Sequence, residues 1–256
     1  MRIATWNVNS LNVRLGRVEE WLDYAQPDVL CLQETKLADA AFPYLALEAR
    51  GYQAAHHGQG RWNGVAILSR VGIKDVTVGM PASEEGDPLE ARLLTATCGE
   101  VRVSSVYVPN GRSLADDHYR YKLAWLADLR RFLEATGDPT APTIVAGDFN
   151  IAPGDLDVAP GIRAETHTSP EVRGSLGALL DWGMVDVFRQ HHPTEPIYSW
   201  WDYRAGDFHK GRGLRIDLLL ASAAVAERTS FVLVDRQARK GKLPSDHAPV
   251  LLDADL

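Results

Sequence analysis

Polar side chains that could hold a metal or move a proton stand at the ends of several short apolar segments. They are Asn7, Glu34, Asp148, Asn150, Asp217, Asp246 and His247. Any one of them alone is typical of a helix cap or a surface turn. A carboxylate at the edge of a core is costly unless something pairs with it, so several that converge call for a cation. Oxygen ligands without thiolates favour Mg²⁺ or Mn²⁺ over zinc.

His247 differs from the other histidines because Asp246 precedes it and Asp217 lies in an apolar segment. An imidazole oriented by a carboxylate can present a charge to a phosphate or transfer protons. The alternative is a histidine at the entrance to the last strand. The pairs His56-His57 and His191-His192 lack partners at ligand spacing, and we expect solvated loops there. Walker, Rossmann, nucleophile-elbow and HExxH motifs are missing.

The elements that must position these residues are short β-branched segments and a few helices. The expected strands are Arg2–Asn7, Val29–Leu32, Val65–Ser69, Leu93–Thr97, Val101–Val108, Thr143–Ala146, Leu214–Ala221, Phe231–Val234 and Ala248–Ala254. Apolar residues recur every three or four positions and predict a helix over Asp116–Ala135. Two more helices are expected at Leu15–Ala25 and Leu176–Trp182. This order predicts an α/β protein with two sheets covered by helices, in one domain over residues 1–256.

Composition restricts the classes of function. The chain has 256 residues, 27 Lys and Arg against 34 Asp and Glu, and a net charge of −7. This balance argues against a protein that coats nucleic acid, but it permits a locally basic groove. Cys31 and Cys98 are too few for a disulfide scaffold, so a cytoplasmic location is the simplest expectation. No apolar segment approaches about 18 residues, which argues against a membrane protein.

The motifs together resemble those of one family. TWNVNSL, LQETK, VYVPNG, GDFN, SWWDYR, LRIDLLLAS and SDHAPV occur in the order and context of the exodeoxyribonuclease III family, within the endonuclease/exonuclease/phosphatase superfamily. The resemblance spans residues 2–250. It implies a four-layer α/β sandwich and a Mg²⁺-dependent DNA-repair nuclease, with Mn²⁺ able to replace Mg²⁺. It also implies incision 5′ of abasic sites and removal of nucleotides or blocking groups from 3′ ends of duplex DNA.

The resemblance assigns a role to each site residue. Glu34 is implied as a principal metal ligand, and Asp148 as the base that activates water. The implied metal-site residues are Asn7, Glu34, Asp148, Asn150, Asp246 and His247. The implied catalytic residues are Tyr107, Asp148, Asn150, Asp217 and His247. Tyr107 and His247 contact the phosphate, Asn150 orients the water or the phosphate, and Asp217 orients His247.

Basic and aromatic segments are the candidates for holding an acidic protein on DNA. The expected DNA contacts are Arg112, Trp200, Trp201, Lys210, Arg212, Leu214 and Lys240. The basic residues have the alternative of solvated loops. We expect one tryptophan to face DNA and the other to pack in the core. Asn9 and Leu214 differ from the acidic residue and the tryptophan of animal abasic endonucleases and resemble the bacterial branch.

Three other functions fit parts of the sequence. The first is a superfamily enzyme that cleaves another phosphoester, in RNA or a lipid headgroup, against which the basic segments and SWWDYR argue. The second is a 3′–5′ exonuclease with little activity at abasic sites. The third is an inactive DNA-binding module, which has no need for Glu34, Asp148 or His247. In every case we expect a monomer without membrane contact.

Overall fold

The computed structural model describes residues 1–80 and 90–256, and within them the strands form two six-stranded sheets. The first sheet has the order β11 (Thr229–Val234), β12 (Val250–Ala254), β1 (Arg2–Asn7), β2 (Val29–Gln33), β4 (Val65–Ser69), β3 (Gln53–His57). The second has the order β5 (Lys74–Val78), β6 (Leu93–Cys98), β7 (Val101–Tyr107), β8 (Thr143–Asp148), β10 (Asp217–Ser222), β9 (Met184–Asp186). The pairs β1–β2 and β7–β8 are parallel, and the others are antiparallel.

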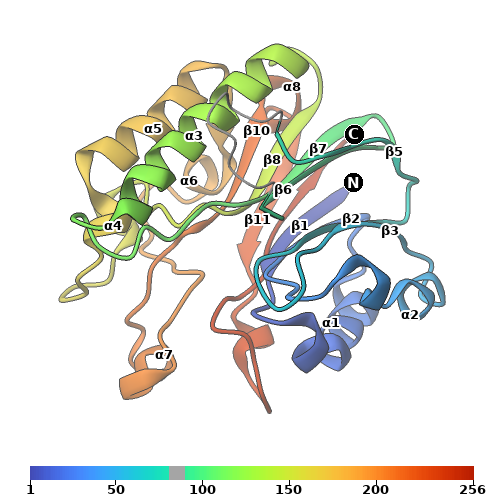
Figure 1. The fold of residues 1–256 in the computed structure, drawn as a ribbon, viewed down its shortest axis with the longest axis horizontal. Coiled ribbons are helices and arrows are strands. Elements are labelled where there is room, and N and C mark those ends of the chain that lie inside the picture. Colours follow the sequence, from blue (N-terminus) through green and yellow to red (C-terminus); the bar gives the residue numbers. More distant parts are fainter. Residues whose placement is uncertain (81–89) are drawn as a thin grey trace.

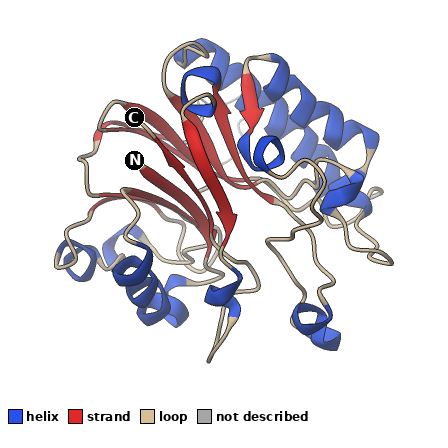
Figure 2. Ribbon diagram, turned by 180° about the vertical axis from the view of Figure 1, so that it is seen from behind, coloured by secondary structure: helices blue, strands red, loops and turns tan. Residues whose placement is uncertain are grey.

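The longer helices lie on the outer faces of the two packed sheets (Figure 1). The first sheet is covered by α1 (Leu11–Ala25) and α2 (Tyr44–Glu48), and the second by α3 (Asp117–Thr136) and α5 (Pro170–Asp181). The sheets face each other across the centre of the molecule (Figure 2). The shorter helices are α4 (Glu165–Thr168), α6 (Val187–His191), α7 (Asp207–Lys210), α8 (Ala223–Ala226), η1 (Asp39–Ala41), η2 (Asp155–Asp157), η3 (Arg204–Gly206) and η4 (Arg236–Arg239). The predicted four-layer α/β sandwich is confirmed.

The apolar strands are buried on both faces, which explains their nearly continuous hydrophobic sequences. In β2, Val29 and Cys31 point into the core between the sheets, while Leu30 and Leu32 pack beneath α1. In β8, Ile144 faces the inter-sheet core and Val145 packs beneath α3 and α5. Burial of both faces fixes the register of each strand, because a slip by one residue would exchange the side chains that face the other sheet with those that pack beneath the helices. The strand ends that carry the polar residues are therefore firmly placed.

Three strands and several boundaries differ from the sequence prediction, among them the start of α1, which lies at Leu11 rather than Leu15. The strands β3, β5 and β9 were not predicted, since Gln53–His57 and Lys74–Val78 are polar edge strands and Met184–Asp186 is short. The predicted strand Leu214–Ala221 starts only at Asp217, because Leu214 instead bridges Val158 and Trp200. The helix predicted to begin at Leu176 begins at Pro170, where the Ser169 side chain caps it by accepting from the Val172 N–H at 3.2 Å.

The prediction that His56-His57 and His191-His192 are solvated loop residues was wrong for His56 and His57, which lie in β3, and for His191, which ends α6. His56 lies in β3 with its side chain buried, 2.8 Å from Thr35 Oγ1 and 2.8 Å from Asp39 Oδ1. His192 is half-buried, and its Nε2 lies 2.9 Å from the carbonyl oxygen of Val232. Partners distant in the sequence fix both rings, and ligand spacing cannot reveal such partners.

Acidification will destabilise the fold through His56. Burial lowers the pKa of His56 to about 4, with Asp39 opposing only part of the shift, whereas a histidine in an unfolded chain titrates near pH 6.5, a typical value. As the pH falls, His56 therefore takes up a proton in the unfolded chain before it does so in the folded chain. The contribution of His56 to the free energy of unfolding is thus present above about pH 6.5 and is lost as the pH falls towards 4. Between about pH 7.5 and pH 5 we expect a loss of about 2 kcal/mol in the free energy of unfolding.

Thermal or urea unfolding across this pH range checks the expectation. His56→Asn should show a smaller pH dependence than the unsubstituted chain, and the exposed His118→Asn should match the unsubstituted chain. An identical pH dependence in His56→Asn would show that His56 does not contribute.

Candidate active site

Polar side chains from both sheets converge at one edge of the sandwich. In the first sheet β1 and β2 are parallel, so Asn7 at the end of β1 and Glu34 just after β2 share an edge. In the second sheet, parallel pairing sets Tyr107 opposite Asp148, and β10 begins opposite Asp148 with Asp217. The packing of the two sheets then brings both sets together. The convergence expected from the sequence is therefore present.

Asn7 joins the two sheets at the centre of the site. Its buried Nδ2 donates to Glu34 Oε1 at 2.9 Å and to Asp148 Oδ2 at 2.9 Å. Its Oδ1 accepts from the backbone N–H of Asn9 at 2.9 Å, which fixes the orientation of the amide. One side chain thus holds carboxylates of the two sheets beside each other.

His247 is buried and oriented by Asp217. Its Nδ1 lies 3.0 and 2.9 Å from the two carboxylate oxygens of Asp217, and its Nε2 lies 3.8 Å from Asp148 Oδ2. Burial by itself lowers the pKa of an imidazole, but the charges of Asp217 and Asp148 outweigh it and raise the pKa of His247. His247 is therefore a cation whose Nε2–H faces the site.

Asp148 and Asn150 form a tight turn after β8. The backbone N–H of Asn150 donates to Asp148 Oδ1 at 2.9 Å, and Asn150 Nδ2 donates to the carbonyl oxygen of Val108 at 2.9 Å. Asn150 Oδ1 accepts from Asn110 Nδ2 at 3.1 Å. Burial raises the pKa of Asp148 although His247 opposes the shift, so this carboxylate is a stronger base than an exposed one.

Tyr107 and Lys36 complete the surroundings of Glu34. Burial, followed by the charges of Glu34 and Asp148, raises the pKa of the Tyr107 phenol well above its usual value, so its hydroxyl stays a donor. Lys36 Nζ lies 2.9 Å from Glu34 Oε2 and 2.6 Å from Asn9 Oδ1. Lys36 was not among the predicted site residues, although it lies only two residues after Glu34 in LQETK.

Backbone strain concentrates around these residues. Glu34, Lys36, Asn9 and Asn150 have φ values of 52°, 52°, 43° and 51°, in the left-handed region. Such conformations cost about 1 kcal/mol or more and persist only where the surroundings enforce them. At Gly147 in GDFN, a Cβ would lie 1.9 Å from the carbonyl oxygen of Val106, so only glycine permits the close pairing of β8 with β7. These local features fix the directions in which the polar side chains point.

Glu34, Asp148 and His247 form a group that could hold a metal ion. One ligand atom from each lies within 4.8 Å of the others. The donors are two carboxylates and an imidazole without a thiolate, which fits a hard divalent cation.

Asp246 lies outside this group. Its two carboxylate oxygens accept from Trp200 Nε1 and Asn9 Nδ2, each at 3.0 Å. Burial raises the pKa of a carboxyl group, but His247 and these donors outweigh it, and the pKa of Asp246 is lowered. Asp246 is thus an ionised residue that orients Trp200 and Asn9, and its direct contact with a metal stays a prediction.

The comparisons with known proteins agree with this geometry. Residues 4–247 match the Endonuclease/Exonuclease/phosphatase family. The chain is 37% identical to exodeoxyribonuclease III of Haemophilus influenzae, with 98% of each chain covered. It superposes with a TM-score of 0.95 on an AP endonuclease from Archaeoglobus fulgidus, at 37% identity and full coverage of both chains. A 3′ phosphatase, NExo, from Neisseria bound to product DNA hairpin has 42% identity, a TM-score of 0.93 and full coverage of both chains.

The chain belongs to the exodeoxyribonuclease III branch of this family. It is a hydrolase, a nuclease of DNA repair. In residues 1–80 and 90–256, no helix combines the length and the apolar character needed to span a bilayer.

The residues expected to contact DNA surround the nuclease site unevenly. Arg112 is exposed and lines a cavity of about 620 Å³ that also includes Tyr107. Trp200, Arg212 and Leu214 line a second cavity of about 270 Å³, together with His167. Trp200 and Leu214 thus share a cavity with charged residues, and His167 in its wall was not predicted because no motif contains that residue.

Trp201 has no exposed surface that could contact DNA. Its side chain is fully buried in the core between the sheets and packs edge-on against Phe208, with ring centres 5.1 Å apart. The assignment of Trp201 as a DNA contact is therefore corrected, and Trp200 is the tryptophan that reaches a surface cavity. Trp200 forms β-bridges with Leu214 and His247, so the backbone is extended there. Successive side chains of an extended segment point to opposite sides, so Trp200 faces the cavity and Trp201 faces the core.

In the basic segment 236–242, some charged side chains are buried and others are exposed. Arg239 is buried over Trp201, Tyr203 and Phe208, and its Nη1 donates to the carbonyl oxygen of Ser245. Lys240 and Lys242 are exposed, as is Lys210 in the other basic segment. Arg236 is also exposed and lies over the rings of Trp201 and Phe208, so the exposed positive charge of this segment comes from Arg236 and the two lysines.

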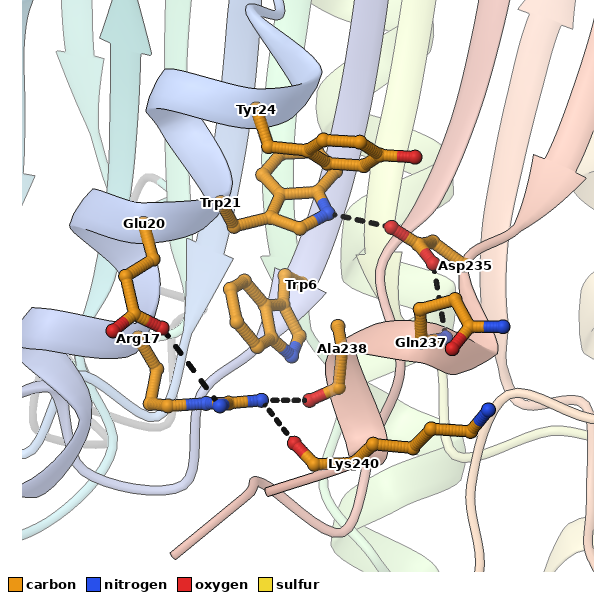
Figure 3. Close-up of a pocket in the computed structure, with 9 residues that line it drawn as sticks. All are labelled: Trp6, Arg17, Glu20, Trp21, Tyr24, Asp235, Gln237, Ala238 and Lys240. Carbon is orange, nitrogen blue, oxygen red and sulfur yellow. Dashed lines mark hydrogen bonds and ion pairs between the residues drawn. The ribbon is translucent and has the colours of Figure 1, made fainter. Parts of the chain in front are cut away.

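Arg17 of α1 fixes the position of Lys240. Its Nη2 donates to the carbonyl oxygens of Ala238 and Lys240 at 2.8 and 2.5 Å. These contacts border a cavity of about 370 Å³ between α1 and η4, with Trp6 and Trp21 in its wall (Figure 3). The loop that presents Lys240 is thus held against α1.

Reversing the charge of Lys240 will weaken DNA binding. If Lys240 contacts a phosphate, Lys240→Glu should lower affinity and reduce the slope of log K against log salt by about 0.9 per lost contact. Titration of a labelled duplex over a range of salt concentrations measures both. Lys74→Glu, the same charge change on the edge strand β5, is the matched control. An unchanged slope for Lys240→Glu would return this segment to the solvated-loop interpretation.

Proposed function

We propose that this nuclease hydrolyses phosphoesters at 3′ ends of duplex DNA and phosphodiesters on the 5′ side of abasic sites, with Mg²⁺ as the cation and Mn²⁺ as a substitute. The observation that carries the proposal is the convergence of Glu34, Asp148 and His247 in a buried site. We further propose that residues 1–256 form one domain and act as a monomer.

Asp148 is the group that takes the proton from the attacking water. Burial raises its pKa, and both of its oxygens already accept fixed hydrogen bonds from Asn7 and Asn150, which hold the carboxylate in place. A base must lie within hydrogen-bond reach of the proton that it removes. Asn150 uses one N–H of its amide on Val108 and has a second for the water or the phosphate.

His247 and Tyr107 stabilise the charge that develops on the phosphoryl oxygens. His247 Nδ1 donates a hydrogen bond to the Asp217 carboxylate, so the proton on Nε2 is available to the phosphate. The Tyr107 hydroxyl donates from the second sheet. A preorganised donor in such a site contributes about 3 kcal/mol. Glu34 and Asp148 would hold the divalent ion beside the imidazolium of His247, and the ion when bound would act as a Lewis acid on the phosphate.

A 3′-specific enzyme with little activity at abasic sites is the second candidate. The Neisseria relative with 42% identity is described as a 3′ phosphatase and carries product DNA, which favours action at 3′ ends. The cavity lined by Trp200 and Leu214 favours a place for a base-free sugar. The two observations concern different substrates of the same site.

A side-by-side assay decides between these activities. Duplexes that contain an abasic site, a nick with a 3′ phosphate, or a blunt 3′ end are incubated with the protein and Mg²⁺, and RNA and a phosphoinositide serve as comparison phosphoesters. We expect cleavage of the DNA substrates with rates far above those for RNA or lipid. Cleavage of the nicked and blunt duplexes alone would select the 3′-specific enzyme. Preferred hydrolysis of RNA or lipid would overturn the proposal.

A further inference from the structure

Lys122 is a fully buried cation that the mechanism above does not use. It lies on α3, whose other buried residues are mostly apolar. Its Nζ donates to the carbonyl oxygens of Asn150 at 2.6 Å, Thr166 at 2.7 Å and Asn110 at 3.3 Å. Among the described residues, no carboxylate lies within 4.0 Å of this nitrogen. A buried charge without an ion pair is expensive, so its position requires an explanation.

The three carbonyl oxygens belong to three separate segments around Asn150. Asn110 follows β7, Asn150 follows β8, and Thr166 lies in α4. Three acceptors require three N–H donors, which only the protonated ammonium has. Lys122 therefore ties these segments to α3. A Cβ at Gly111 would lie 3.2 Å from Lys122 Cδ, so the loop after β7 also packs closely on the lysine stem.

The same segments hold the side-chain amide of Asn150. Asn110 Nδ2 lies 3.1 Å from Asn150 Oδ1, and His167 Nε2, next to Thr166, lies 3.3 Å from that oxygen. Two of the three segments that Lys122 anchors therefore also contact the Asn150 side-chain amide, through Asn110 and His167. The third segment carries Asn150 itself. A shift of these segments would rotate the one N–H of Asn150 that is free for the water or the phosphate.

We propose that Lys122 is a positioning residue for phosphoester hydrolysis, which acts by fixing the backbone and the side-chain amide of Asn150. The inference rests on the proposed role of Asn150. A misplacement of about 1 Å in such a group can lower the rate by about 10²-fold. Substrate binding depends on the exposed DNA-contacting residues, so the loss falls on kcat rather than on KM.

Lys122→Met, which keeps the length of the side chain and removes the ammonium, is the direct test. We expect kcat on a duplex with a cleavable 3′ end to fall about 30- to 100-fold, with KM within about threefold. Lys122→Gln retains two N–H donors and should recover part of kcat. Arg130→Met is the matched control, since Arg130 also lies on α3 and donates to a carbonyl oxygen, that of Ala178, and it should leave kcat within about twofold.

A double-mutant cycle with Asn150→Ala separates positioning from a general loss of structure. If Lys122 acts through Asn150, the double variant will be no slower than Asn150→Ala within about threefold. Multiplied losses, or a kcat within about twofold of normal in Lys122→Met, would overturn the inference. If Lys122→Met does not fold, the cycle is run with Lys122→Gln under the same criteria. Cleavage by the unsubstituted protein in the same assay tests the proposed function separately.

Discussion

Asp148→Asn will abolish cleavage while the protein remains folded and bound to DNA. The substitution removes the negative charge and the base at the centre of the site, where Asp148 lies between Asn7 and His247. General-base catalysis contributes about 10² to 10⁴-fold, and loss of one metal-ligand charge adds to this, so we expect kcat to fall by at least about 10³-fold. Single-turnover cleavage of a labelled duplex measures the loss, and filter binding or anisotropy measures affinity.

The controls for Asp148 separate chemistry from folding. Asp181→Asn makes the same change at the exposed end of α5 and should retain normal activity. His247→Ala should lose cleavage as Asp148→Asn does, because the imidazolium that faces Asp148 is removed. Duplex affinity in both active-site variants should stay within about tenfold, since phosphate contacts elsewhere supply most of it. A parallel loss of affinity and cleavage would show that these residues serve the structure instead.

The architecture was predictable where burial is strong. β2 and β8 are apolar on both faces, and their sequences alone locate them and the polar residues that follow them. Edge strands were less predictable, because all five residues of β5 are exposed and its sequence KDVTV has only Val76 and Val78 as apolar residues. The four-layer arrangement came from the resemblance, since hydrophobic pattern gives no pairing order among strands.

The three residues that converge in the candidate site could be located from the sequence, but their geometry could not. The motifs provided Glu34, Asp148 and His247, whereas the bridging role of Asn7 depends on the packing of one sheet on the other. Lys122 was not predicted, although it lies three residues after Tyr119 and four before Leu126 on the buried face of α3. Its partners are carbonyl oxygens of segments 12 to 44 residues away. Backbone acceptors leave no trace in a sequence, so such contacts become visible only in the folded structure.

Chelation of divalent ions will stop cleavage completely, and Mg²⁺ or Mn²⁺ will restore it. Without a cation, the carboxylates of Glu34 and Asp148 repel the phosphate that must approach them, and His247, Lys36 and Tyr107 offset part of that repulsion. Lewis-acid stabilisation of the phosphoryl transition state contributes several kcal/mol. The rate on a 3′-blocked duplex is measured after treatment with EDTA, and again after each ion is added at known free concentration.

Glu34→Gln connects this requirement to the proposed ligands. It removes one carboxylate from the group of Glu34, Asp148 and His247 while keeping the size of the side chain, so the Mg²⁺ concentration for half-maximal rate should rise at least about tenfold. Glu227→Gln, at the exposed end of α8, should leave that concentration unchanged. A full rate after exhaustive chelation would refute metal-dependent hydrolysis here. A metal requirement that Glu34→Gln does not alter would instead move the ion away from Glu34, towards Asp148 and the ionised Asp246.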